Sequence, residues 1–296
     1  MAEVLVLQPR LREVGRSQVR RVLPAAKRQA VGPFLFFDHF GPQLFEAFKD
    51  SGIGPHPHIG LSTVTYLFEG NLVHRDSVGS VQSIEPGAIN WMTAGRGIAH
   101  SERTPPELLG RAHRAHGLQL WTGMPKALED REPSFAHTDK AAIPEDAREQ
   151  ARVRVLVGKA WGMESPVVPV SETLYLDIAL PAGGQLEIGA LAAERALYSV
   201  DGAFQLQGTR IEPCVMAVLP AGETVRLEAQ TPAHVMLIGG EPLDGPRFMW
   251  WNFVHSRRDR ILEAAAEWKA NHTPRIEGEK DWVPLPSSLP LGAQPR

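Results

Sequence analysis

Residues 54–103 read GPHPHIGLSTVTYLFEGNLVHRDSVGSVQSIEPGAINWMTAGRGIAHSER and decide the fold. The stretch begins with one pair of metal-capable side chains, His56 and His58, and ends with another, His100 and Glu102. Each pair is spaced i, i+2, and in an extended strand that spacing sends both side chains to the same face. Two such strands meeting inside a small barrel would direct three imidazoles and one carboxylate to a common point.

The segments around these pairs are typical of short antiparallel strands. Runs of β-branched and aromatic residues alternate with turns that carry Gly and Pro, which indicates a barrel or jelly roll. The same pattern returns from residue 152 to about 238, with turns at 181–184, 201–202 and 220–222. We therefore expect an all-β protein with two barrels in tandem, followed by a short C-terminal helix. Within residues 54–103, the expected strands cover 63–68, 71–74, 82–84 and 89–92.

The four side chains are candidate ligands of one divalent transition metal. Three neutral imidazoles and a carboxylate suit iron, manganese, cobalt, nickel, copper or zinc. A single pair of this kind is more often two ordinary polar strand residues. Two pairs in neighbouring motifs, each beside Gly or Pro, favour the metal interpretation. Further histidines that could add ligands are His39, His113 and His116, for which structural roles are the simpler expectation.

The two motifs resemble those of a known family. HPHIGLSTVTYLFEG and PGAINWMTAGRGIAHSE are similar to the two metal-binding motifs of the pirin family, whose members are bicupin proteins. VRRVLPAAKRQAVGPFLFFDHFGP upstream resembles the family's N-terminal signature, and the resemblance returns at EPLDGPRFMWWNFV. The four segments span residues 56–70, 86–102, 19–42 and 241–254.

The resemblance implies one mononuclear metal in the N-terminal cupin, most often iron(II), with His56, His58, His100 and Glu102 as ligands. It also implies a quercetin 2,3-dioxygenase type of activity, in which a flavonol or a related enolic or phenolic substrate is cleaved with O2. Glu102 would then double as the catalytic base. The alternative is a redox-sensing regulator that binds a transcription factor or another protein partner. A metal protein whose catalytic role has lapsed is a third, weaker alternative.

One position departs from the family pattern. Many pirin-like sequences carry Glu four residues after the second histidine of the first motif, whereas this chain has Ser62. We expect this exchange to remove an inward carboxylate and to leave the four ligands unchanged.

Composition limits the other classes of function. The net charge is −3, the pI is about 6.4, and Cys214 is the only cysteine. This balance gives no general attraction to nucleic acid or to a membrane surface, and one cysteine per chain excludes an intrachain disulfide. The start of the chain has no signal-peptide pattern, and no apolar run approaches the length of a membrane span. We therefore expect a cytoplasmic protein without direct nucleic-acid binding.

The expected layout has four parts: an N-terminal metal-binding barrel (1–124), a linker region (125–151), a second barrel (152–245), and a C-terminal helix and tail (246–296). His234 is the one histidine between residues 153 and 240, so the second barrel should bind no metal. In the last part, Ser256 could cap a helix. The apolar stripe of that helix would comprise Ile261, Leu262, Ala265 and Trp268.

Overall fold

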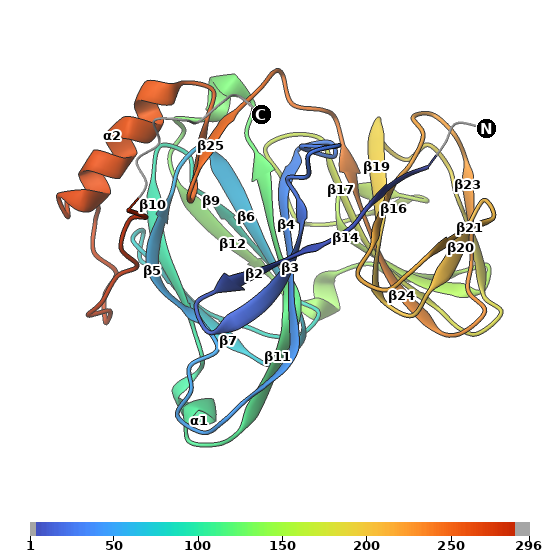
Figure 1. The fold of residues 1–296 in the computed structure, drawn as a ribbon, viewed down its shortest axis with the longest axis horizontal. Helices are drawn as coiled ribbons and strands as arrows, with labels where there is room; N and C mark the ends of the chain where they lie inside the picture. The colour runs from blue at the N-terminus through green and yellow to red at the C-terminus, as the bar shows by residue number, and fades with distance from the viewer. Residues whose placement is uncertain (1–3, 288–296) are drawn as a thin grey trace. The chain divides into compact units, whose positions relative to one another are not determined.

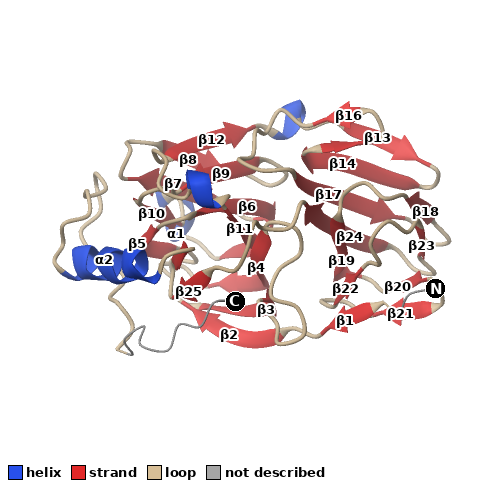
Figure 2. Cartoon of the chain, turned by 90° about the horizontal axis from the view of Figure 1, so that it is seen from above, coloured by secondary structure: helices blue, strands red, loops and turns tan. Residues whose placement is uncertain are grey.

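The computed structural model describes residues 4–287, and strands dominate them. The strands, in red in Figure 2, far outnumber the two α-helices, in blue, which confirms the predicted all-β class. Contacts divide the chain into two compact units, which are described separately below. The unit that contains both histidine motifs, here called the motif unit, comprises Arg12–Val19, Phe40–His137 and Leu243–Arg296. The second unit comprises Met1–Leu11, Arg20–His39 and Thr138–Pro242.

The strands labelled in Figure 1 that carry the motifs belong to two antiparallel sheets. The larger sheet has the order β12-β9-β6-β11-β4-β3-β2, and its strands β2, β3 and β4 contain residues of both units. These strands are β2 (Arg10–Val14), β3 (Ser17–Leu23), β4 (Phe34–Phe45), β6 (Leu61–Glu69), β9 (Ile89–Thr93), β11 (His113–Gly123) and β12 (Ser134–Thr138). The smaller sheet has the order β5-β10-β7-β8, with β5 (Ile53–His58), β7 (Leu72–Asp76), β8 (Val81–Ile84) and β10 (Ile98–Arg103).

The second unit repeats this pairing of a larger and a smaller antiparallel sheet. The larger sheet has the order β1-β22-β19-β24-β17-β14-β13 and the smaller one β18-β23-β20-β21. The strands of the larger sheet are β1 (Leu5–Leu7), β13 (Glu145–Arg148), β14 (Ala151–Val157), β17 (Thr173–Leu180), β19 (Glu194–Asp201), β22 (Met216–Val218) and β24 (Ala233–Gly240). Those of the smaller sheet are β18 (Gln185–Ile188), β20 (Phe204–Leu206), β21 (Thr209–Ile211) and β23 (Val225–Glu228), and β15 (Lys159–Ala160) and β16 (Met163–Glu164) form a separate hairpin.

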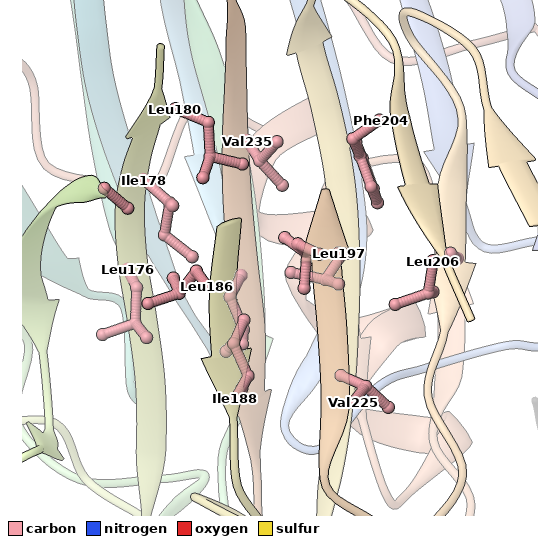
Figure 3. Close-up of a cluster of buried hydrophobic side chains, with 14 of the residues drawn as sticks. Leu176, Ile178, Leu180, Leu186, Ile188, Leu197, Phe204, Leu206, Val225 and Val235 are labelled. Atoms are coloured by element: carbon pink, nitrogen blue, oxygen red, sulfur yellow. The ribbon is translucent and has the colours of Figure 1, made fainter. Parts of the chain in front are cut away.

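Alternation along the strands builds the core of the second unit. On β17, Leu176, Ile178 and Leu180 are buried in one cluster, while Asp177 between them is on the other face and accepts a hydrogen bond from His234. Figure 3 shows these leucine and isoleucine side chains together with apolar side chains of β18, β19, β20, β23 and β24. A core filled from both sheets is the packing expected of a jelly roll.

The C-terminal part adds the hairpin β25 (Phe248–Trp250) and β26 (Phe253–His255), followed by helix α2 (Arg258–Lys269). The predicted helix is therefore present, but two details of the prediction are wrong. Arg257 is at the N-cap without a side-chain cap, because the Ser256 hydroxyl donates to Glu129 instead. Leu262 is exposed, and the buried face of the helix comprises Ile261, Ala264 and Ala265.

The remaining elements are short. They are α1 (Pro106–Leu109), which the sequence did not predict, and the 3-10 turns η1 (Lys126–Leu128) and η2 (Lys140–Ala142). Within residues 4–287, no helix has the length and apolar character needed to cross a membrane. The contact division groups Met1–Leu11 with the second unit, where β1 pairs with β22. The predicted division of the chain into residues 1–124, 125–151, 152–245 and 246–296 remains a prediction.

Candidate metal centre

Strands β5 and β10 bring the three motif histidines together. The two strands are antiparallel, with His100 opposite His56 and Ile98 opposite His58. Because residues directly opposite in an antiparallel pair share a face, all three imidazoles point to the same side of the sheet. Each offers one ring nitrogen, and these three nitrogens lie within 4.8 Å of one another. The geometry expected from the i, i+2 spacing is therefore present.

All three imidazoles are buried, and burial favours their neutral form. Burial lowers the pKa of His56 to about 4, more than offsetting the hydrogen bond to Gly54 that raises it. Burial also holds the pKa values of His58 and His100 well below their usual range, and the neighbouring imidazoles lower them further. A neutral imidazole is the form that binds a metal, so at neutral pH these side chains need not lose a proton to act as ligands.

Hydrogen bonds determine which nitrogen of each imidazole ring remains available to bind a metal. Nδ1 of His56 donates to the Gly54 carbonyl at 2.8 Å, and Nδ1 of His58 donates to the Asn252 carbonyl at 3.0 Å. A carbonyl can only accept, so both rings carry the proton on Nδ1 and leave Nε2 with a lone pair. Nε2 of His100 is buried and has no hydrogen-bond partner among the described residues. A buried polar nitrogen left in this way, beside two free lone pairs, fits a bound metal.

Glu102 lies two residues beyond His100 on β10, opposite His74 of β7. Its carboxyl group is buried, and Thr65 Oγ1 donates to Glu102 Oε1 at 2.7 Å. Burial raises the pKa of Glu102, although the Thr65 hydrogen bond opposes the shift. The register of β10 against β5 shifts between His100 and Glu102, and bulges of this kind redirect side chains beside functional sites. Glu102 is outside the group of nitrogens within 4.8 Å, so its role as fourth ligand stays a prediction.

Ser62 does not take the place of an inward carboxylate. Along β6, Thr65 faces Glu102, and the pairing of β6 with β9 and β11 is regular from Ser62 to Thr65. Ser62 is three residues from Thr65, so it points to the opposite face of the sheet, where its hydroxyl lies 3.4 Å from Thr93 Oγ1. A glutamate at position 62 would therefore point away from the face that carries Thr65 and Glu102. The expectation that Ser62 removes an inward carboxylate is wrong for this strand pairing.

The hairpin β25–β26 supplies the Asn252 carbonyl that holds His58. Phe253 forms an isolated bridge with Ile59, and the backbone N–H of Val254 donates to the Ile59 carbonyl at 3.2 Å. Gly60 makes this close approach feasible, because a Cβ at that position would lie 2.0 Å from the Val254 carbonyl oxygen. A backbone carbonyl carries no sequence signature, so this partner could not be found from the motif.

Sequence reasoning also missed His74 and Asp76, which lie on β7 beside β10. They have the same i, i+2 spacing as the recognised pairs, and this signal could have found them. Both are buried, and His74 Nδ1 lies 3.4 Å from His100 Nδ1. The weaker candidates have structural partners: His39 contacts Tyr198 in the second unit, His113 stacks on Phe45, and His116 packs against Phe68.

Comparison with known proteins places the chain in a family. Residues 16–122 match the Pirin family, and residues 175–274 match the Pirin C-terminal cupin domain. A pirin-like protein of Caulobacter vibrioides is 42% identical over 95% of this chain and 99% of its own length. Rat pirin is 34% identical over 90% of each chain.

A solved structure agrees with these matches over nearly the whole chain. The crystal structure of quercetin 2,3-dioxygenase from Acinetobacter baumannii is 32% identical, with a TM-score of 0.91 over 99% of this chain and 97% of that chain. The predicted tandem cupin architecture is thereby confirmed. By its two matching domains and by its relatives, this chain belongs to the pirin family.

Proposed function

We propose that His56, His58 and His100 hold one divalent transition metal, with Glu102 as the fourth ligand. One observation supports this proposal: three buried, neutral imidazoles bring one ring nitrogen each to within 4.8 Å of the others. Nε2 of His56 and Nε2 of His58 have free lone pairs, and Nε2 of His100 has no hydrogen-bond partner among the described residues. The donor set accepts iron, nickel, manganese, cobalt, copper or zinc, and the family resemblance favours iron(II).

We further propose an O2-dependent dioxygenase that acts on a flavonol or a related enolic or phenolic substrate. The similarity to a quercetin 2,3-dioxygenase supports this choice of reaction. When bound, such a metal would act as a Lewis acid that polarises the enolic or phenolic oxygen of the substrate.

Glu102 is the residue of this chain proposed to take the substrate's hydroxyl proton. Burial raises the pKa of its carboxyl group, and the Thr65 hydrogen bond opposes this shift. The Thr65 hydroxyl holds one carboxylate oxygen in place at 2.7 Å. The fixed oxygen limits the rotation of the carboxylate and keeps it aimed at the histidines' side of β10. Thr65 therefore positions the base and does not itself react.

The test has two stages. Elemental analysis after growth with iron, nickel and manganese should find close to one metal ion per chain, and His58→Ala or His100→Ala should lose most of it. Oxygen uptake is then followed with a panel of flavonols and small enediols. Glu102→Gln should keep part of the metal, because an amide oxygen can still coordinate, but lose uptake, because an amide accepts no proton near neutral pH.

Zinc-loaded protein serves as a control for occupancy without metal redox chemistry. If the purified protein binds no metal under any of these conditions, the site assignment is wrong. Stoichiometric metal with no oxygen uptake for any substrate would overturn the dioxygenase and favour a redox-sensing regulator that binds a protein partner.

A further inference from the structure

A second imidazole–carboxylate pair lies against the proposed metal site. His74 and Asp76 are both on β7, where Asp76 is directly opposite His100 and His74 is opposite Glu102. His74 Nε2 lies 2.9 Å from Asp76 Oδ2, and His74 Nδ1 lies 3.4 Å from His100 Nδ1. The side chains of the pair are 2% and 0% exposed, so water cannot substitute for these contacts.

This pair gives His100 an environment that the other two histidines lack. Nδ1 of His56 and Nδ1 of His58 each face a backbone carbonyl, which can only accept a hydrogen bond. Nδ1 of His100 faces another imidazole, which can either donate or accept. The ligand nitrogen of His100 is therefore available only if the proton between the two rings belongs to His100.

Asp76 determines where that proton lies. Its Oδ1 accepts the backbone N–H groups of Val78 at 3.0 Å and Ser80 at 2.9 Å, which fixes the carboxylate. Its Oδ2 can only accept from His74, so a neutral His74 carries its proton on Nε2 and presents a lone pair at Nδ1. His100 must then donate through Nδ1, which leaves its Nε2 without a proton. This order agrees with the buried His100 Nε2, which lacks a hydrogen-bond partner among residues 4–287.

The His74 ring is also held from its face. Phe135 of β12 stacks on it, with ring centroids 4.1 Å apart and an interplanar angle of 16°. The ring is therefore fixed in its plane by Asp76 and across its plane by Phe135. Because the His74 ring has little freedom to rotate, its Nδ1 stays directed at Nδ1 of His100.

We propose that Asp76 and His74 form a proton-ordered relay that positions His100 and keeps its Nε2 lone pair directed at the metal. Neither residue is a ligand in this proposal. A carboxylate behind a metal-binding histidine fixes its tautomer and raises its basicity, and here the carboxylate acts through an intervening imidazole. The inference rests on the metal site proposed above.

The decisive variant is Asp76→Asn. The N–H groups of Val78 and Ser80 would hold the remaining carbonyl oxygen, so the amide NH2 would face His74 Nε2 and donate to it. His74 would then carry its proton on Nδ1, and His100 would have to accept there and place its own proton on Nε2. An Nε2 that carries a proton cannot bind a metal. The same replacement of aspartate by asparagine in the serine protease triad keeps the geometry but lowers activity, because the histidine adopts the wrong tautomer.

Two measurements read out this proton order. Calorimetric titration of the apo protein with Co(II) should show affinity reduced about 10- to 100-fold in Asp76→Asn, the range seen for lost outer-shell partners. Asp76→Ala leaves His74 free to choose its tautomer, so its affinity should be no weaker than that of Asp76→Asn. Nitrogen-15 NMR of the apo protein should place the His100 proton on Nδ1 in the wild type and on Nε2 in Asp76→Asn.

The matched control is His113→Gln, which alters a buried histidine of the motif unit whose Nδ1 donates to the Arg111 carbonyl. Its Co(II) affinity should equal that of the wild type. If Asp76→Asn binds Co(II) within twofold of the wild type, or binds it clearly better than Asp76→Ala, the relay is refuted. The same holds if wild-type His100 carries its proton on Nε2. A wild type that binds no metal would refute the proposed function, whereas the NMR result would still decide the proton order.

Discussion

Glu129 offers a sharp test of what holds the C-terminal hairpin and helix in the motif unit. Its carboxylate is fully buried and forms an ion pair with Arg247, with Oε1 2.5 Å from Nε. The same carboxylate accepts the backbone N–H of Ser256 at 2.9 Å and its hydroxyl at 2.5 Å, just before α2 begins. Glu129→Gln keeps the shape and one acceptor oxygen but removes the charge.

The expected cost follows from what is left behind. The Arg247 side chain is 2% exposed, so the variant leaves a guanidinium buried without its buried counter-charge. Breaking such a pair from one side costs about 3–5 kcal/mol. Asp244, half-exposed, still pairs with Arg247, so we expect the lower end of this range, about 3 kcal/mol. The exposed pair Arg96–Glu132 provides the control: Glu132→Gln should change the free energy of unfolding by less than about 0.5 kcal/mol.

Urea unfolding followed by tryptophan fluorescence is a suitable assay. Six of the seven tryptophans belong to the motif unit, and Trp161 belongs to the second unit. With a denaturant slope of about 2 kcal/mol per molar urea, a loss of about 3 kcal/mol lowers the midpoint by about 1.5 M. The double variant Glu129→Gln/Arg247→Met should show a coupling energy above about 1.5 kcal/mol. A Glu129→Gln midpoint equal to that of Glu132→Gln would refute the reasoning.

Three further predictions concern acid stability, metal content and the core. Burial raises the pKa of Glu279, but hydrogen bonds from Arg103 and Ser101, together with the positive charge of Arg103, lower it by more, so its net shift is downward. Its stabilisation should therefore be present above the unfolded pKa, near 4, and lost as pH falls through the folded value; urea midpoints measured from pH 7 to 3 should fall less steeply in Glu279→Gln. His234→Ala should leave the metal content of purified protein unchanged, and a second ion that disappears in this variant would contradict the expectation. Leu197→Ala in the core of Figure 3 should cost about 2–5 kcal/mol by thermal or urea unfolding, and a cost below 1 kcal/mol would contradict close packing there.

The histidine cluster could be predicted because it depends on local periodicity. His56 and His58 share a face of any strand that contains both, and the second motif requires only that β10 lie beside β5. The strand pattern likewise gave the tandem all-β architecture, since short runs broken by Gly and Pro allow few alternatives. Helix α2 was predictable from its period, but Leu262 and Ala264 lie on opposite sides of Ile261 on the helical wheel, about 100° and about 60° away. Which of them is buried depends on the neighbouring hairpin.

The rest of the site depends on contacts between distant segments. Asn252 contributes a backbone carbonyl, whose position does not depend on the type of side chain. The register shift next to Glu102 depends on the pairing of two strands, and neither strand alone encodes it. Ser62 was misplaced because spacing shows that it and Thr65 are on opposite faces but does not show which face is inner. His74 could have been found, since it obeys the spacing rule already applied to its neighbours.

The hydrogen bond from His58 to the Asn252 carbonyl makes the proposed metal centre depend on the order of protein synthesis. A nascent chain that has emerged through β10 carries all three histidines, but almost 150 further residues must follow before Asn252 leaves the ribosome. Until then the carbonyl in the turn between β25 and β26 cannot hold the His58 ring, and the free imidazole can adopt either tautomer. Metal acquired during translation would meet an unfinished site, whereas metal acquired after release would meet one whose His58 ring is already oriented. The proposed centre is therefore complete only late in synthesis, although both histidine motifs are translated early.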